Sequence, residues 1–333
     1  MKAPGFWWRA PGLAARSLQP TSLIYGAVAA RRMRQPGQRA QLPVICIGNV
    51  TVGGSGKTPT AIHIASMLRS MGRRPAFLTR GYGGALAGPL VVDPGHHSPR
   101  EVGDESLLLA RDAPTIVSQD RPAGAALAAS LAANAIVMDD GLQNPSLEKD
   151  LSIAVFDGAV GTGNGLCLPA GPLRAPLSAQ WPQIDAVIVI GPGEAGDAVH
   201  TKAIRRGLPV FRGELRPAPA AAAALSGRRI LAFAGIGRPE KFFATLRQIG
   251  AEVVETRAFA DHHPYRLGEV AHLLDAARRQ NLVPVTTEKD GVRLAALAAA
   301  EPRVSEVREL PVSLSLLQAD RLGRLLETTL AGR

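Results

Sequence analysis

A glycine-rich segment, residues 43–59, carries the side chains best suited to chemistry. It reads PVICIGNVTVGGSGKTP, an apolar run followed by a loop that ends in Gly-Lys-Thr. Glycines let consecutive backbone N–H groups face one anion, while Lys57 can reach the β- and γ-phosphates and the Thr58 hydroxyl can ligate Mg²⁺. The strict pattern G-x-x-x-x-G-K-S/T has glycine where this chain has Thr51, a mild departure. We therefore predict a loop that binds a nucleoside triphosphate through Thr51, Val52, Gly53, Gly54, Ser55, Gly56, Lys57 and Thr58.

Two adjacent acids, Asp139 and Asp140, follow the apolar residues 135–138. A P-loop enzyme needs a carboxylate at the end of a second strand to hold Mg²⁺ or its water shell. We expect a metal site formed by Thr58, Asp139 and Asp140, and the sequence does not choose which acid touches the metal directly.

Two further polar clusters invite a catalytic interpretation. Asp104 opens an apolar helical run, where an aspartate is most often a helix cap, and local sequence alone favours the cap. The segment 261–265, DHHPY, lies between an expected strand and an expected helix. A histidine beside a carboxylate is the commonest equipment for proton transfer, although such a pair can also simply cap a helix.

The segment 286–290, TTEKD, invites comparison with the guanine-reading pattern Asn/Thr-Lys-x-Asp. Lys289 and Asp290 are adjacent, so the spacing fails and ATP is favoured over GTP. Arg80 and Arg174 lie in glycine- or proline-rich turns and are candidate anion clamps, with an ordinary solvated arginine as the equal alternative.

The composition limits the function classes. The 333 residues are 46% hydrophobic, enough for two domains, and the formal net charge of +10 fits an anionic partner. No basic stripe with interleaved aromatic residues is present, so a nucleic-acid partner is not expected, and no obligate protein partner is evident. The two cysteines form no metal-binding or disulfide pattern, which favours a reducing cytoplasmic compartment.

Residues 1–35 have a composition of their own. Aromatic residues, leucines and arginines are mixed there, and prolines divide the segment into short pieces. No run is long enough for a membrane-spanning helix, and the pattern of a secretory signal is missing. We expect an amphipathic segment on an anionic membrane surface, with a helix packed on its own domain as the equally open alternative.

From residue 43 onward, short Val/Ile-rich runs alternate with helical patterns, which is typical of βαβ units around a parallel sheet. Strands are expected near 43–48, 75–79, 114–118, 135–139, 152–156, 185–190, 208–213, 229–234, 252–257 and 282–286. Helices are expected near 58–70, 104–111, 121–132, 238–249, 266–280 and 316–330, with 216–224 as a connector. We predict a P-loop NTPase-like parallel-sheet domain at 36–176 and a smaller α/β/α domain at 177–333, whose C-terminal helix is a candidate to pack back on the first.

The motifs in order resemble the tetraacyldisaccharide 4′-kinase family of lipid A biosynthesis along nearly the whole chain. The resemblance rests on the P-loop and on the segments RGYG at 80–83, GDE at 103–105, DDGLQ at 139–143, GPLR at 171–174, DHH at 261–263 and TTEKD at 286–290. One departure is Asn144, where the family commonly has histidine.

The resemblance implies an ATP- and Mg²⁺-dependent kinase that phosphorylates the 4′-hydroxyl of an acylated glucosamine disaccharide 1-phosphate, giving the lipid A precursor lipid IVA. It implies peripheral attachment to the cytoplasmic face of the bacterial inner membrane. It also implies that Asp104 and His262 form the dyad that activates the hydroxyl. Further candidates for substrate or anion contacts are Asn49, Arg80, Tyr82, Glu105, Gln143 and Arg174.

The main alternative from another class is a P-loop GTPase that acts as a metal or protein-maturation switch. It would need a guanine-reading motif and usually metal-binding Cys or His runs, and neither is evident in the sequence.

Overall fold

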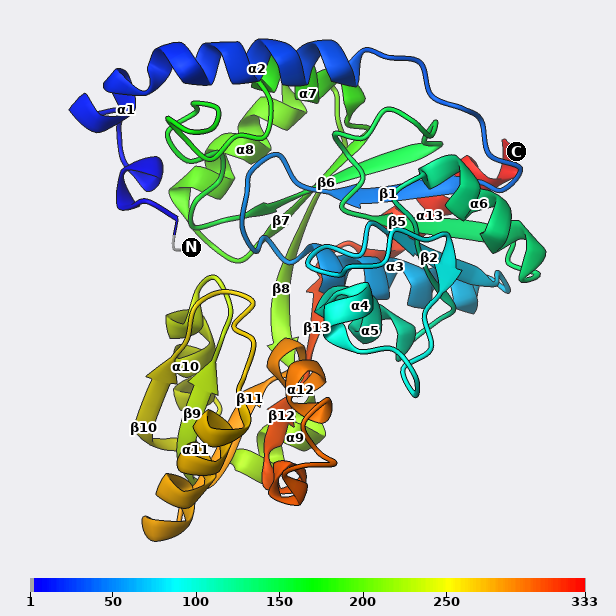
Figure 1. The fold of residues 1–333 in the computed structure, drawn as a ribbon. Helices are drawn as coiled ribbons and strands as arrows, with labels where there is room; N and C mark the ends of the chain where they lie inside the picture. The colour runs from blue at the N-terminus through cyan, green and yellow to red at the C-terminus, as the bar shows by residue number, and fades with distance from the viewer. Residues whose placement is uncertain (1–2, 333) are drawn as a thin grey trace.

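The computed structural model describes residues 3–332, and its larger sheet has nine strands in the order β13-β8-β7-β6-β1-β5-β2-β4-β3 (Figure 1). The strands are β1 (Val44–Gly48), β2 (Pro75–Thr79), β3 (Leu90–Val91), β4 (Thr115–Val117), β5 (Ala135–Asp139), β6 (Leu151–Asp157), β7 (Ala186–Ile190), β8 (Val210–Pro217) and β13 (Val312–Leu316). All neighbours pair in parallel except at the two edges, where β3 and β13 run antiparallel to their neighbours. The loops that follow the seven parallel strands therefore meet at one edge of the sheet.

Helices cover both faces of this sheet. Ile45 and Ile47 of β1 point into a core shared with α3 (Lys57–Ser70), α5 (Asp104–Ala110) and α13 (Ala319–Ala331). Val44 and Cys46 point to the opposite face, which is covered by α6 (Arg121–Ser130), α7 (Leu177–Gln180), the short η2 (Trp181–Gln183) and α8 (Glu194–Ile204). A strand buried on both faces reads as a continuous apolar run, which is why the sequence shows Val44–Ile47 without alternation.

The second sheet has four parallel strands in the order β10-β9-β11-β12. These are β9 (Arg229–Ala234), β10 (Glu252–Ala258), β11 (Val283–Thr287) and β12 (Arg308–Leu310). One face packs on α9 (Pro219–Leu225) and α10 (Pro239–Gln248), and the other on α11 (Leu267–Arg279) and α12 (Glu288–Ala295). The predicted fold class, a P-loop-like parallel sheet with a smaller α/β/α domain, is confirmed.

The boundary predicted between residues 176 and 177 falls inside the larger sheet. Strands β7 and β8 extend that sheet beyond β6, and β13 closes it at the edge. Leu322, Leu326 and Leu330 of α13 are buried in the core of the same sheet. The second domain is therefore the insertion from about 218 to 311, joined to the first through the antiparallel pair β8 and β13. Residues 158–176, between β6 and α7, form a loop within the first domain. The final residue of the predicted 177–333 range lies outside the described residues.

Several elements were not predicted. The expected connector 216–224 forms the end of β8 and most of α9, and α8 and α12 are helices that the sequence analysis did not assign. The short elements α4 (Pro99–Val102) and η3 (Pro302–Glu306) are also new.

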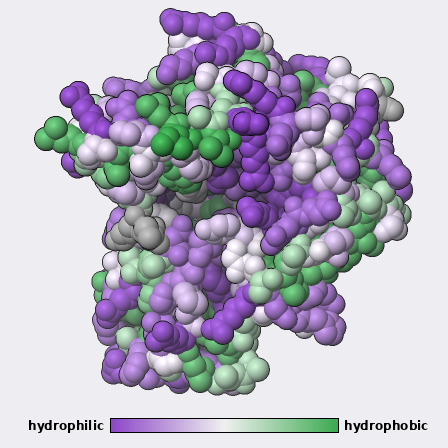
Figure 2. All heavy atoms as spheres, turned by 45° about the horizontal axis from the view of Figure 1, so that its top comes forward, coloured by the Kyte–Doolittle hydropathy of each residue, from purple (hydrophilic) through white to green (hydrophobic). Residues whose placement is uncertain are grey.

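The N-terminal segment forms η1 (Gly5–Trp8), α1 (Leu13–Ser17) and α2 (Gln19–Met33), and the first two residues of the predicted 1–35 segment lie outside the described residues. Helix α2 buries Ser22 and Gly26 against the loop around Cys167 and Pro176. The exposed apolar face of α1 and α2, visible in Figure 2, consists of Leu13, Leu23, Ile24, Tyr25 and Val28. Between residues 3 and 332, no helix combines the length and apolar character needed to cross a membrane.

Candidate active site

The glycine loop of residues 51–56 connects β1 to α3 as predicted. Gly53 and Gly56 have φ values of 105° and 90°, which favour glycine, and no atom approaches within 4 Å of a Cβ built at Gly53 or Gly54. The loop therefore keeps an open concave side. Pro59 lies in the first turn of α3, where the backbone N–H has no helical partner to lose, so the proline after Thr58 is compatible with the helix.

The entry to the loop is held by neighbouring segments. The Val52 N–H donates to the Pro172 carbonyl (2.9 Å), and Arg174 Nε donates to the Thr51 carbonyl (3.1 Å). Gln143 Nε2 donates to the Asn49 carbonyl at 2.7 Å, while Asn49 Nδ2 donates to the Gly53 carbonyl at 3.3 Å. These contacts give Asn49 and Gln143 a positioning geometry beside the loop rather than an open face toward a ligand.

The two acids at the end of β5, Asp139 and Asp140, lie against the loop. Thr58 Oγ1 donates to Asp139 Oδ2 at 3.3 Å, and Lys57 Nζ lies 3.7 Å from Asp140 Oδ2. Arg174 Nη1 pairs with Asp140 Oδ1 at 2.7 Å. Burial by itself would raise the pKa of Asp140, but the charges of Lys57 and Arg174 outweigh it and lower that pKa. Arg174 thus packs beside the glycine loop, against Thr51 and Asp140, and is not an unpaired surface arginine.

Asp139 has the properties of a metal-binding carboxylate. Its side chain is buried, and its Oδ1 atom has no hydrogen-bond partner in the described part of the chain. Burial, and next the charge of Glu105, raise the pKa of Asp139 to about 7. A buried carboxylate with an unpaired oxygen, in contact with the P-loop hydroxyl of Thr58, is the donor set that Mg²⁺ takes in P-loop proteins. The residues present therefore fit the expected metal.

Asp104 and His262 come from different domains and meet directly. His262 Nδ1 lies 3.0 Å from Asp104 Oδ2, although 158 residues separate them in sequence. Asp104 is the first residue of α5 and its Oδ1 accepts the Glu105 N–H at 2.9 Å, but the N-cap is Gly103, so Asp104 is not the helix cap that local sequence favoured. The pairing is the geometry that proton transfer to a carboxylate–imidazole dyad needs.

The charges around the dyad set its protonation. Burial alone would raise the pKa of Asp104, but the hydrogen bond from His262 and the charges of His262 and Arg293 hold that pKa at about 2. The same hydrogen bond raises the pKa of His262 above its ordinary value of 6.5. The dyad therefore carries its exchangeable proton on the imidazole.

Two cations of α12 complete this region, and the sequence analysis did not select them. Arg293 Nε donates to Asp104 Oδ2 at 3.0 Å, and Lys289 Nζ pairs with Glu105. Burial by itself would lower the pKa of Lys289, but its pairing with Glu105 raises that pKa to about 12. Local sequence offered one usable signal, a basic residue every four positions in 289–293 on a short helix that follows a strand.

Asp290, which lies between these two cations in sequence, has a structural role. Its buried carboxylate accepts from the Tyr265 hydroxyl (2.9 Å), the Gly235 N–H (3.0 Å) and Thr287 Oγ1 (2.6 Å). The TTEKD segment thus fixes the start of α12, so that Lys289 and the following turn face α5.

The remaining candidates, Tyr82 and Arg80, are exposed side chains. The ring of Tyr82, 68% exposed, lies edge-on to His262 with centroids 5.6 Å apart. Arg80 at the end of β2 is exposed and pairs with no carboxylate among residues 3–332. The structure thus brings Tyr82 to the dyad, whereas Arg80 has no contact that identifies a ligand.

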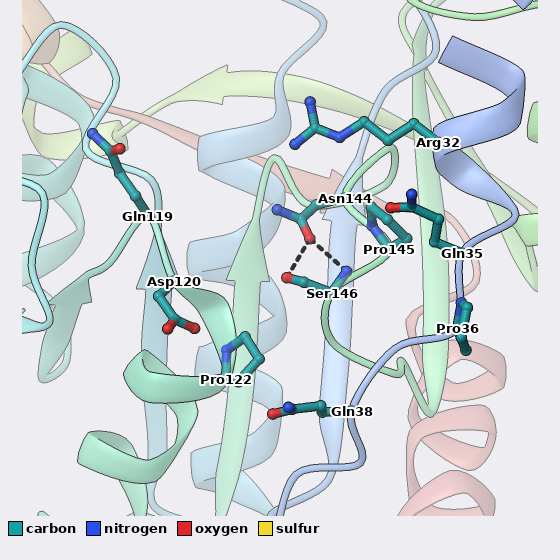
Figure 3. A pocket seen from close by; sticks show the side chains of 10 residues that line it. All are labelled: Arg32, Gln35, Pro36, Gln38, Gln119, Asp120, Pro122, Asn144, Pro145 and Ser146. Atoms are coloured by element: carbon teal, nitrogen blue, oxygen red, sulfur yellow. Dashed lines mark hydrogen bonds between the residues drawn. The ribbon is translucent and has the colours of Figure 1, made fainter. Parts of the chain in front are cut away.

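A polar hollow of about 440 Å³ lies beyond the acid-bearing loop (Figure 3). It is lined by Arg32, Gln35, Pro36, Gln38, Gln119, Asp120, Pro122, Asn144, Pro145 and Ser146. Asn144 Oδ1 accepts from the Ser146 N–H and hydroxyl at 2.8 and 2.7 Å, so the residue that departs from the family pattern closes a local turn. None of the residues expected to bind ATP or transfer a proton lines this hollow.

A P-loop that faces paired acids, with an Asp–His dyad supplied across two α/β domains, defines a P-loop phosphotransferase. The family model of tetraacyldisaccharide-1-P 4′-kinase (LpxK) matches residues 14–331. The chain belongs to this family.

Relatives with this name span nearly its whole length. The tetraacyldisaccharide 4′-kinase of Methylobacterium nodulans is 63% identical over 321 residues, covering 96% of this chain and 93% of the relative. That of Rhodopseudomonas palustris is 52% identical over 318 residues, covering 95% and 92%. The crystal structure of LpxK from Aquifex aeolicus in complex with ATP has a TM-score of 0.73 and 26% identity, covering 96% of this chain and all of the other. The alternative of a regulatory GTPase is not favoured by these relatives.

Proposed function

We propose that this chain transfers the γ-phosphate of ATP to the 4′-hydroxyl of a tetraacylated glucosamine disaccharide 1-phosphate, giving lipid IVA and ADP. The observation that carries the proposal is the contact of His262 with Asp104 beside a P-loop, within a chain of the tetraacyldisaccharide 4′-kinase family. The name of the relatives supplies the acceptor, and the ATP complex of the Aquifex aeolicus structure supports the donor.

The reaction needs positioning, charge neutralisation and a proton acceptor. The bond between the γ-phosphorus and the β–γ bridging oxygen breaks while the acceptor oxygen bonds to the γ-phosphorus. Lys57 and the backbone N–H groups of the glycine loop stabilise the triphosphate charge. The hydroxyl proton passes to the dyad of Asp104 and His262, and ADP leaves with the bridging oxygen.

Thr58 and Asp139 are the residues that would hold Mg²⁺, with Asp140 beside them. When bound, the metal supplies charge neutralisation to the phosphate oxygens. Asp140, whose pKa is lowered by Lys57 and Arg174, keeps its negative charge and orients both cations toward the loop.

We further propose that the protein works on the cytoplasmic face of the bacterial inner membrane, as a peripheral protein. The support is the exposed apolar face of α1 and α2, defined above, with Arg16, Arg31 and Arg32 exposed beside it. Apolar side chains flanked by arginines suit the headgroup region of an anionic leaflet, where an acylated acceptor would also lie.

The direct test uses the purified full-length chain, the disaccharide 1-phosphate in detergent micelles, Mg²⁺ and γ-labelled ATP or GTP. We expect label in a lipid product from ATP, with phosphate at the 4′ position by NMR, and much less from GTP. If the chain binds ATP but no labelled lipid forms, the assigned acceptor is contradicted. A preference for GTP would favour the alternative of a regulatory P-loop GTPase.

A further inference from the structure

A second ionic contact joins the two domains on the opposite flank of the P-loop. Asp157 ends β6, and its side chain is 5% exposed. Its Oδ2 atom pairs with Arg238, and Lys241 Nζ lies 3.5 Å from the same oxygen. Both cations belong to the second domain, at the residue before α10 and in its first turn.

This contact lies at the end of a strand next to the one that leads into the glycine loop. Strand β6 is the direct neighbour of β1, and Asp157 pairs with Ile190 of β7. The Ile190 side chain in turn lies against Gly56, since its Cδ1 is 2.7 Å from a Cβ built there. Asp157 is therefore the register neighbour of the residue whose side chain packs on Gly56.

The sheet order indicates which part of ATP would face these cations. The acids follow β5 on one side of β1, and β6 with Asp157 lies on the other side. The γ-phosphate has to face the acids and the dyad, because the phosphoryl transfer takes place there. The α-phosphate and the nucleoside must then extend toward the β6 side.

The same loop of the second domain reaches both flanks. The His262 N–H donates to the Gly235 carbonyl at 3.0 Å, and a Cβ built at Gly237 would lie 3.3 Å from the Asp261 carboxylate. Arg238 follows directly. The loop 235–238 connects β9 to α10 (Figure 1). It thus supports the dyad on one side and carries Arg238 to Asp157 on the other.

The charges at this contact are unbalanced. One carboxylate faces two cations, and its second oxygen accepts the Ala159 N–H at 2.9 Å. The side chains of Arg238 and Lys241 are 40% and 50% exposed, so most of their donors stay free. Burial lowers the pKa of both cations, but two cations facing one carboxylate still leave the cluster with a net positive charge.

We propose that Arg238 and Lys241 bind the α- and β-phosphates of ATP, and that Asp157 is the positioning residue that holds them over the glycine loop. This inference rests on the proposed use of ATP and adds a nucleotide contact from the second domain. Arg238 presents a planar fork suited to phosphate oxygens, and Lys241 adds a point charge.

The test measures equilibrium binding of ATP and ADP to the full chain by calorimetry, without acceptor. Arg238→Ala and Lys241→Ala should each raise Kd about ten-fold, the scale of one charge-assisted hydrogen bond, and by the same factor for ATP and ADP because the γ-phosphate is not contacted. Asp157→Asn should raise both Kd values by a smaller factor. Arg247→Ala, at the other end of α10, is the matched control and should leave Kd unchanged.

Three results would overturn the proposal. One is a Kd within two-fold of wild type for both cation variants. Another is an equal loss in Arg247→Ala. The third is a fall in kcat with unchanged nucleotide affinity, which would mean that the contact only positions His262. Thermal unfolding midpoints and the charge-retaining Arg238→Lys variant separate misfolding from a lost contact. If the wild-type chain itself failed to bind ATP, the proposed function would fail instead.

Discussion

Replacing Asp104 by asparagine tests the dyad with the smallest change in shape. The carboxylate is 4% exposed and accepts from His262, Arg293 and the Glu105 N–H. An asparagine offers one oxygen acceptor in place of two. Its NH₂ group would face N–H donors that now point at the second carboxylate oxygen. Asparagine also lacks the hydrogen-bonding carboxylate and its negative charge, which raise the pKa of His262, so the imidazole becomes a weaker proton acceptor. We expect turnover to fall by ~10²–10⁴, the range of general-base catalysis, while the Kd of ATP stays within about two-fold.

The loss of charge also leaves Arg293 without its partner, so the unfolding midpoint has to be measured in parallel. Asp112→Asn is the matched control, because Asp112 follows the same helix and pairs with Arg69 far from the dyad. The assay follows label from γ-labelled ATP into lipid at saturating acceptor, with calorimetric ATP binding alongside. A folded Asp104→Asn protein that turns over within three-fold of wild type would refute the reasoning, and so would a large loss of ATP affinity with unchanged turnover.

Three further outcomes are expected. The proton-free dyad is the accepting form and the pKa of His262 is raised above its ordinary value of 6.5, so kcat/KM should fall as pH drops through that raised pKa. The inflection should disappear in His262→Gln, and a flat wild-type profile with chemistry rate-limiting would contradict this. Lys289→Met removes the partner of Glu105 and should lower kcat about ten-fold in the same lipid-labelling assay. Lys202→Met on α8 is the control and should leave kcat unchanged. Equal rates for both variants would exclude a contribution of α12 to turnover. Replacing Leu23, Ile24 and Val28 together by serine should weaken the affinity for anionic vesicles, measured by sedimentation, about 100-fold, because each side chain contributes about 1 kcal/mol. Ile204→Ser, equally apolar and 52% exposed, serves as control, and undiminished vesicle binding of the triple variant would reject the membrane-facing surface.

Local sequence predicts the phosphate-binding half of the site well, because its parts are adjacent in the chain. The glycine loop needs positive φ at Gly53 and Gly56, and it is followed at once by the lysine and threonine that use it. The acids after β5 are likewise fixed by their position at the end of a strand next to β1. The sequence motif therefore indicates both the residues of the phosphate-binding half and the strand and helix that position them.

The parts that sequence reasoning missed depend on contacts between distant segments. Lys289 and Glu105 are 184 residues apart, and Arg293 and Asp104 are 189 apart. The spacing of Lys289 and Arg293 places both on one face of α12, but it does not indicate that this face meets α5. The domain boundary was misplaced for a similar reason, since a strand such as β7 reads alike whether it extends the first sheet or begins a second.

The central claim is that a carboxylate of one domain and an imidazole of the other act as one proton acceptor. A double-mutant cycle on kcat with Asp104→Asn, His262→Gln and the double variant measures this directly. Groups that act as a unit are not additive, so the double variant should be about as slow as Asp104→Asn alone. A double variant slowed by the product of the two single effects would show two independent contributions and would contradict the account.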